Sequence, residues 1–151
     1  MPGTPFAGGI YAGRLFVGDQ AYALIVAPKD EGELEESVWG STKQEVTGAL
    51  SCCNGFANTL AMEAAGSALA KWARALRIGG LDDWYLPSRI EALIALAELR
   101  DQFEKTWYWT STQYALDAQY AWCQGFHYGL QGYHHKPLEL RARAVRRVPI
   151  Q

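Results

Sequence analysis

Four side chains that could bind a metal ion lie close together near the C-terminal end of the chain. Cys123 is followed by three histidines, and the span from Cys123 to the last of them covers thirteen residues: His127, His134 and His135. The spacing of the set matches no established zinc pattern, in which ligands come in closely spaced pairs. Histidines that face solvent or pack on a sheet are the commoner alternative. The sequence therefore predicts no metal and no cofactor.

Carboxylates gather at two places where a hard cation could bind. The segment 29–37 carries four glutamates, Glu31, Glu33, Glu35 and Glu36. Such clusters are usually exposed to solvent, so we expect an acidic loop rather than a cation site. The pair Asp82-Asp83 follows two glycines, and a turn accounts for these residues better than a metal site does.

Hydroxyl and thiol groups that could act as nucleophiles have no recognisable catalytic partners. The run 110–112 is Thr-Ser-Thr, a β-prone sequence with no histidine or acid in a local motif. Cys52, Cys53 and Cys123 make an odd number, and adjacent cysteines rarely bridge each other. Buried, reduced thiols are the favoured interpretation. The sequence thus predicts a protein that is not an enzyme.

Composition favours one globular domain. The chain has 151 residues, 49% of them hydrophobic, and a formal net charge of −2. A chain of this length can bury a sizeable core, and it lacks the basic character typical of nucleic-acid binding. No apolar run approaches 18 residues, so we expect no membrane insertion. Residues 1–5 lack the features of a signal peptide, so synthesis and folding in a cytosol are expected.

The elements that must position these groups are organised around residues 79–91. Two glycines and two aspartates at 79–83 predict a turn. An apolar run at 84–86 follows, and Pro87 holds the residue before it in an extended conformation. Ser88 and Glu91 have the spacing of a capping box, which predicts a helix start at this point. We expect a helix over 88–103 with an apolar face formed by Ile90, Leu93, Ile94 and Ala97.

The N-terminal half contains weaker signals. Residues 1–9 are rich in proline and glycine and are predicted to be an arm. The runs 10–17 and 21–26 predict a β-hairpin, whereas 39–56 is expected to be mostly loop. Asn58 and Ser67 are the predicted caps of two helices. The second helix would bury one face and end at Gly79, that face being Leu69, Trp72, Ala73 and Leu76.

Aromatic residues are concentrated in the C-terminal half. Residues 107–133 contain nine of the nineteen aromatic side chains in the chain, and three glycines lie among them. This composition predicts a meander of short antiparallel strands joined by tight turns. The strand predicted at 141–148 would close the sheet.

Three motifs occur in an order that resembles a known family. The first is Gly79, Gly80, Asp83, Trp84, Leu86, Pro87, Ser88, Arg89, Glu91 and Leu93. The second is Tyr108, Trp109, Thr110, Ser111, Thr112, Tyr120, Ala121 and Trp122. The third is Arg143, Ala144, Val145 and Arg146. Together they resemble the Lcl C-terminal domain family (DUF1566) of bacterial and phage proteins, over roughly residues 55–148.

The resemblance implies an α+β, C-type-lectin-like fold over residues 10–151. It would contain an N-terminal β-hairpin, two or three helices and a twisted antiparallel sheet, related to the formylglycine-generating-enzyme fold and used mostly for binding. Calcium-dependent lectins use a Glu-Pro-Asn or Gln-Pro-Asp loop of oxygen ligands. The corresponding region here is Lys136-Pro137-Leu138, which supplies none. Calcium binding is therefore not expected.

Site residues follow partly from the resemblance. Trp84, Trp109 and Trp122 lie in its motifs and are expected to be structural anchors, as is Arg143, whose predicted partner is a carboxylate such as Asp83 or backbone carbonyls. The predicted binding residues are aromatic and histidine side chains at expected turns or strand ends: Tyr114, Tyr128, Tyr133, His134 and His135. Such rings suit sugar and protein surfaces alike. The alternative is that they only fill the sheet.

The function that the resemblance implies is host recognition in a virion. We expect a phage tail-tip or tail-fibre component, made in the host cytoplasm, that binds a glycan or protein receptor. The N-terminal arm would attach it to other tail proteins, in a homo-oligomer such as a trimer. The first alternative is a bacterial carbohydrate- or ligand-binding protein outside any virion. The second is an enzyme of the formylglycine-generating type.

Overall fold

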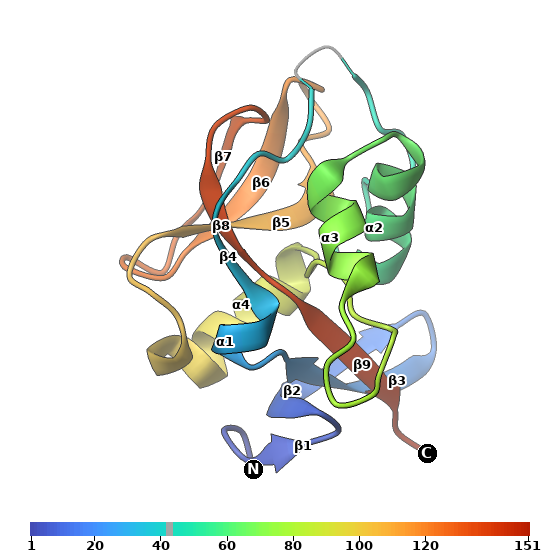
Figure 1. Cartoon of the computed structure of the whole chain (residues 1–151), viewed down its shortest axis with the longest axis vertical. Helices are drawn as coiled ribbons and strands as arrows, with labels where there is room; N and C mark the ends of the chain where they lie inside the picture. Colours follow the sequence, from blue (N-terminus) through green and yellow to red (C-terminus); the bar gives the residue numbers. More distant parts are fainter. Residues whose placement is uncertain (42–43) are drawn as a thin grey trace.

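The computed structural model describes residues 1–41 and 44–151, and it is a mixed α+β protein with two sheets (Figure 1). The first sheet has the strand order β1-β2-β3-β9, with bounds Pro5–Phe6, Gly9–Val17, Gln20–Val26 and Val145–Pro149. The second has the order β4-β8-β5-β6-β7, with bounds Glu33–Ser37, Leu140–Arg143, Trp107–Gln113, Tyr120–Gly125 and Gln131–His135. The α+β class predicted from the sequence is confirmed.

Short helices cover these sheets. They are α1, α2, α3, α4 and the 3-10 turn η1, with bounds Lys29–Gly32, Gly55–Ala64, Ala68–Ala75, Arg89–Leu99 and Arg100–Gln102. Helix α4 contacts β2 of the first sheet and β5 and β6 of the second. It therefore ties the two sheets together. No helix in the part of the chain that the structure describes is long and apolar enough to cross a membrane.

The N-terminal residues fold against their own chain. Strand β1 pairs with β2 through Pro5↔Ile10 and Phe6↔Gly9, and the Gly3 N–H donates to the Tyr11 carbonyl at 2.9 Å. The expectation of an arm with nothing to pack against is wrong, because the backbone of β1 completes the edge of the first sheet. The predicted hairpin that follows is confirmed as β2 and β3.

Capping residues define the starts of the helices. The Ser88–Glu91 capping box at α4 is confirmed, and so is the Ser67 cap at α3. Helix α2 is instead capped by Asn54, four residues before the predicted Asn58. Asn58 lies inside that helix, where its side chain accepts from the Ser51 N–H and donates to the Ser51 carbonyl. The predicted loop at 39–56 has no regular element before α2, and residues 42–43 of it lie outside the described residues.

The turn at Gly79 and Gly80 lies beyond the end of α3 and does not terminate that helix. Helix α3 stops at Ala75, four residues before the predicted end at Gly79. Gly79 and Gly80 have φ values of +63° and +73°, and Ile78 and Leu81 form a β-bridge across them. The two glycines are required because side chains rarely adopt positive φ.

Helix α4 is rotated relative to the predicted face. Ile90 and Leu93 are exposed by 41% and 38%, whereas Ala92 and Ala95 are buried. The cause is Glu91, whose carboxylate accepts from the Ser88 and Gly55 N–H groups and from the Tyr85 hydroxyl. These bonds hold Glu91 inward, so Ala92, Ala95 and Leu99 face the sheets, Ile94 is half-buried, and Ile90 and Leu93 face out.

The acidic segment is not a loop and the Glu33 side chain is buried, although Glu31, Glu35 and Glu36 are exposed as expected. Residues 29–37 form α1 and β4, and Glu33 lies opposite Arg143 in the β4–β8 ladder. The Glu33 side chain is 3% exposed and forms ion pairs with Arg143 at 3.1 Å and Arg141 at 2.9 Å. Asp83, the predicted partner of Arg143, pairs with Arg146 instead. The register of β4 on β8 decides this, because it brings Glu33 to Arg143.

One continuous segment joins the two sheets. The strand predicted at 141–148 is divided at Ala144 into β8 of the second sheet and β9 of the first. Ala144 keeps its backbone bonded, donating to the Gly32 carbonyl and accepting from the Ala27 N–H. The chain thus changes sheets without an unpaired backbone group at this residue.

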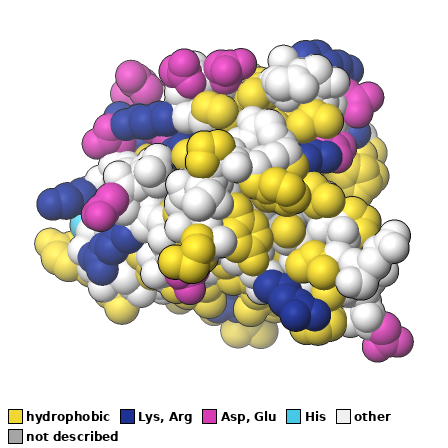
Figure 2. All heavy atoms as spheres, turned by 90° about the horizontal axis from the view of Figure 1, so that it is seen from below, with side chains coloured by type: hydrophobic (Ala, Val, Ile, Leu, Met, Phe, Trp, Pro, Cys, Tyr) yellow, Lys and Arg dark blue, Asp and Glu magenta, His cyan; other side chains and the backbone are white. Residues whose placement is uncertain are grey.

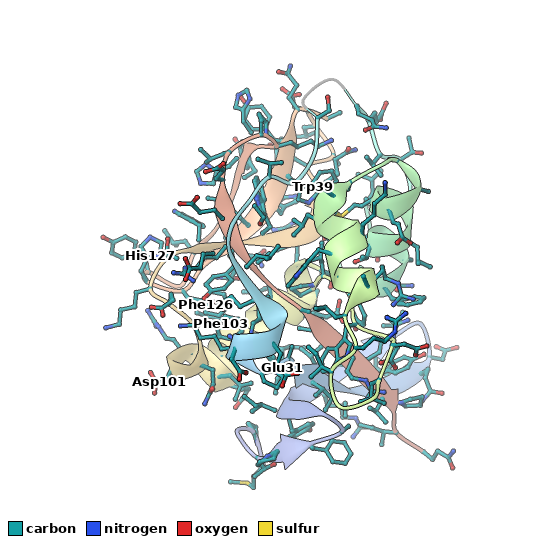
Figure 3. The ribbon with its side chains drawn as sticks, in the orientation of Figure 1. Glu31, Trp39, Asp101, Phe103, Phe126 and His127 are labelled. Carbon is teal, nitrogen blue, oxygen red and sulfur yellow. The ribbon has the colours of Figure 1, made fainter. Side chains whose placement is uncertain are left out.

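The interior is dominated by large rings. Trp84 and Trp109 are 0% and 1% exposed, and Phe103 and Phe126 stack with centroids 4.0 Å apart (Figure 3). Viewed from the side of the N-terminal strands, the molecule shows hydrophobic side chains near the middle of the surface and charged groups toward its margin (Figure 2). Phe6 and Phe16, which are about half exposed, belong to the N-terminal strands.

Candidate functional site

The hairpin of β6 and β7 carries three cross-strand pairs of side chains on one face. In its register Tyr120 lies opposite His135, Trp122 opposite Tyr133, and Gln124 opposite Gln131. Successive side chains on a strand point to opposite faces, so these three pairs share one face of the sheet. The alternation of the sequence thus brings two ring pairs and one amide pair into a row.

Five rings form the cluster that we call the aromatic face: Tyr114, Tyr120, Trp122, Tyr133 and His135. Tyr114, just after β5, stacks on Tyr133 with centroids 4.0 Å apart and planes 21° apart. Trp122 meets both of these rings edge-on, and Tyr120 lies 4.3 Å from His135. The contacts fix each ring through at least one neighbour, which leaves a preformed surface.

Arg89 completes this surface from the first residue of α4. Its guanidinium carbon lies 3.5 Å from the centroid of the Trp122 ring. Its Nε donates to Gln131 Oε1 at 3.0 Å, and Gln131 Nε2 donates to the Arg89 carbonyl at 2.8 Å. Gln131 also donates to Gln124 Oε1 at 2.9 Å. The amide pair on the hairpin therefore holds the arginine flat on the tryptophan.

The aromatic face is partly open to solvent. Tyr133 is 46% exposed and His135 is exposed, whereas Tyr114, Tyr120 and Trp122 are half-buried. The adjacent Tyr133 hydroxyl raises the pKa of Tyr114, and partial burial adds to that effect. The Tyr114 and Tyr133 hydroxyls thus lie near each other and can exchange hydrogen bonds with a ligand.

The structure brings together three of the five predicted binding residues: Tyr114, Tyr133 and His135. Tyr128 lies in the turn between β6 and β7, beyond the Gln124–Gln131 end of the ladder, and is 76% exposed. Its nearest ring is His127, 4.4 Å away, which projects at the side of the molecule in Figure 3. Tyr128 and the aromatic face are therefore at different ends of the hairpin.

His134 is on the opposite side of the sheet. It alternates with Tyr133 and His135, so its ring packs on Trp107 at 5.3 Å, beside His127 on the same tryptophan. Burial lowers the pKa of His134. The prediction that five residues share one binding surface is thus wrong for His134 and Tyr128, because strand alternation and hairpin length separate them.

Three members of the site were missed or misassigned at the level of sequence. Trp122 was predicted to be a core anchor with Trp84 and Trp109, but it is half-buried under Arg89. Tyr120 was not predicted to bind. The period-two spacing of rings at 120 and 122 and at 133 and 135 is a signal that could have found this face. No comparable signal marks Arg89.

The hydroxyl groups of residues 110–112 form hydrogen bonds that stabilise the fold. Thr110, Ser111 and Thr112 are buried, and each side chain donates to a backbone carbonyl, of Trp122, Pro87 and Ser51 respectively. These bonds link β5 to β6, to the Pro87 turn and to the loop before α2. The groups are therefore engaged in cross-links between elements.

The thiols differ in their surroundings. Cys52 is exposed and Cys53 half-buried, so the expectation of buried thiols holds only for Cys123. Burial raises the pKa of Cys123 to about 12, which keeps this thiol protonated and weakly nucleophilic at neutral pH. Among residues 1–41 and 44–151, no group of three or more His, Cys, Asp or Glu side chains is placed to hold a metal ion.

Comparison of the chain with protein-family models and with curated proteins finds no match in either case.

Proposed function

We propose that this chain is a surface-recognition module with a C-type-lectin-like domain, and that it serves as a phage tail-tip or tail-fibre component that binds the host cell. The observation that supports this most is the aromatic face, where partly exposed rings are held on a rigid hairpin. The three motifs that resemble the Lcl C-terminal domain family supply the virion context. The protein would be made in the host cytoplasm and act in the tail.

Rings of this kind suit a binding role. Tyrosine and tryptophan offer a flat apolar body with a polar tip, and they lose little conformational entropy on binding. Binding energy at interfaces concentrates in a few such residues. The stacking of Tyr114 on Tyr133 and of Arg89 on Trp122 orders these groups before any ligand arrives. Preorganisation of this kind reduces the entropic cost of binding.

Attachment to other tail proteins would use the N-terminal segment. Although β1 is paired with β2, Met1 and Phe6 remain 89% and 50% exposed. An exposed apolar edge of this kind can pack on a neighbouring subunit. A homo-oligomer, such as the trimer common to fibre-like assemblies, belongs to this proposal.

The aromatic face equally fits a bacterial carbohydrate- or ligand-binding protein outside any virion. Tail genes next to the gene for this chain would support the phage assignment, whereas a bacterial operon without them would support the alternative. An enzyme of the formylglycine-generating type is less well supported, because such enzymes need a specific arrangement of catalytic cysteines that this sequence does not match.

The test is adsorption of the purified protein to receptor-bearing cells. Tyr114→Ala combined with Tyr133→Ala removes the stacked pair. We expect adsorption to weaken roughly 30-fold or more, which corresponds to about 2 kcal/mol of binding free energy. Tyr128→Ala is the matched control, since this exposed tyrosine lies at the other end of the hairpin.

A thermal melt of each variant accompanies the adsorption measurement. Unchanged melting temperatures with weaker adsorption of the double variant alone would support the proposal. Equal adsorption of wild type and double variant would contradict it. A greater loss with Tyr128→Ala would move the binding surface to the hairpin turn.

A further inference from the structure

Arg89 presents a fixed guanidinium at the edge of the aromatic face. Stacking on Trp122 at 3.5 Å sets the plane of the group, and the Nε bond to Gln131 sets its rotation in that plane. The backbone of Arg89 is also fixed, because it is the first residue of α4 and follows the Ser88 cap. The position of the charge is therefore determined before a ligand binds.

The two terminal nitrogens of Arg89 have no acceptor within the part of the chain that the structure describes, and no carboxylate there forms an ion pair with it. Arg146 shows how such a group is satisfied elsewhere in the molecule. Its Nε and Nη2 donate to the two Asp83 oxygens at 2.7 and 2.8 Å. Because Nε of Arg89 is already bonded to Gln131, the fork that Arg89 offers toward solvent consists of its two terminal nitrogens.

The local field also favours an anion. Arg89 begins an eleven-residue helix, so its charge adds to the partial positive charge of a helix N-terminus. The nearest acid in the same turn is Glu91, but its carboxylate points inward and accepts from three donors. Burial raises the pKa of Glu91.

We propose that the aromatic face binds a carboxylated sugar: Arg89 holds the carboxylate in a two-bond fork, and the sugar ring lies against Tyr133. This inference rests on the proposed binding function. A planar carboxylate matches two parallel guanidinium N–H bonds. The half-exposed Tyr133 ring gives a flat apolar contact for the C–H face of a pyranose, and the Tyr114 and Tyr133 hydroxyls suit sugar hydroxyls.

The binding experiment uses the full chain and isothermal titration calorimetry at low salt. The probes are oligogalacturonate, oligoguluronate and oligosialic acid, each compared with its own methyl ester, which removes the charge and keeps the sugar. We expect at least one acid form to bind, and its ester to bind roughly tenfold more weakly or not at all. No binding to any of the three acid forms, or equal affinity for acid and ester, would overturn the inference.

Variants then assign the effect to Arg89. Arg89→Gln should weaken binding of the acid form roughly tenfold and leave affinity for the ester unchanged. Arg89→Lys keeps the charge but loses the fork, so it should restore only part of the affinity. The control is Arg77→Gln, which removes an exposed arginine outside the aromatic face. A similar loss with Arg77→Gln would indicate a diffuse charge effect and overturn the assignment.

Three further outcomes would overturn this inference, and the last of them leaves the proposed function standing. Tighter binding of a sulfated oligosaccharide without carboxylates than of the uronates would identify a sulfate site. Binding of an acidic peptide alone would identify a protein ligand. Either result overturns the inference of a carboxylated sugar. If cell adsorption is lost with the Tyr114/Tyr133 double variant but retained with Arg89→Gln, the binding function stands and this inference fails.

Discussion

Glu33 and Arg143 form a buried ion pair whose two members are 110 residues apart. Arg143 is 1% exposed, and its Nε and Nη1 also donate to the Ala27 and Gln102 carbonyls. Desolvation lowers the pKa of Arg143, and the neighbouring Glu33 charge opposes that shift. The charge of Arg143 therefore depends on Glu33 for compensation.

Glu33→Ala should destabilise the fold by about 3–5 kcal/mol, because it leaves the arginine charge buried without its partner. Urea unfolding of the variant gives the free energy directly. Glu35→Ala, in the same strand but exposed, is the control and should change stability by no more than about 0.5 kcal/mol. Equal stability of the two variants would mean that the pair does not support the core.

Lys136 is a second buried charge. Its Nζ donates to Gln113 Oε1 and to the Gln44 carbonyl, both at 2.7 Å, and lies 4.6 Å from the Trp39 ring centroid. Burial lowers the pKa of Lys136 from 10.5 to about 8. The folded protein thus releases this proton at a lower pH than the unfolded chain does.

The consequence is a pH dependence of stability. Between pH 8 and pH 10.5 the unfolded chain still holds the Lys136 proton while the folded chain has lost it, so this group makes the free energy of unfolding rise with pH. Lys136→Met should remove that rise, whereas exposed Lys71→Met should keep it. Because tyrosines titrate in the same range, the measured quantity is the difference between each variant and wild type. If the difference in free energy of unfolding between Lys136→Met and wild type is constant with pH, the lowered pKa of Lys136 is contradicted.

Among the elements, α2 packs closely on the start of α4, as the surroundings of Gly55 show. A Cβ on Gly55 would lie 2.5 Å from Glu91 Oε1, 2.5 Å from the Leu86 carbonyl oxygen and 2.7 Å from the Ser88 nitrogen. All three atoms are fixed, two of them in the backbone. The capping box of α4 therefore requires glycine at the first residue of α2.

Gly55→Ala should destabilise the protein by about 3 kcal/mol, at the upper end of the usual cost of overpacking. Thermal and urea unfolding measure this cost. Gly40→Ala is the matched control, because a Cβ there meets nothing within 4 Å. If Gly55→Ala unfolds like Gly40→Ala, the two helix starts do not pack as described.

Local signals predicted elements well and their faces less well. Ser88 with Glu91, and Ser67, identified helix starts because a cap depends on neighbours along the chain. The face of α4 was wrong because inward bonds from Tyr85 and Gly55 to Glu91 override the apolar pattern. Gly55 is 36 residues from Glu91, and Tyr85 lies before the helix begins, so the periodicity of the helix could not show either partner.

For the candidate site too, local signals predicted the strands, whereas tertiary contacts decided which side chains share a face. Aromatic composition predicted the strands and three members of the aromatic face, since rings favour strands whatever lies across from them. It could not place His134 or Tyr128, because their positions depend on register and on where the hairpin turns. Arg89 joins the site only because α4 begins beside β7, which is a tertiary contact.

At the scale of the whole molecule, the N-terminal segment is the part expected to join other chains. Deleting residues 1–4 removes exposed Met1 and keeps the β1–β2 pairs. If this segment contacts neighbouring subunits, the truncated protein should sediment as a smaller species than the full chain at micromolar concentration. The thermal melt should otherwise remain cooperative, because the cores do not include these residues. Identical sedimentation of the two forms would place any subunit contact elsewhere.

Contact of the aromatic face with the cell surface can be measured without any substitution, by hydroxyl-radical footprinting of wild-type protein, free and bound to receptor-bearing cell envelopes. Oxidation should fall on binding at Tyr114, Tyr120, Tyr133 and His135, while oxidation of Tyr128 and Phe16 should be unchanged. Protection confined to Tyr128 or to the N-terminal sheet, with the aromatic face as reactive as in the free protein, would contradict this contact.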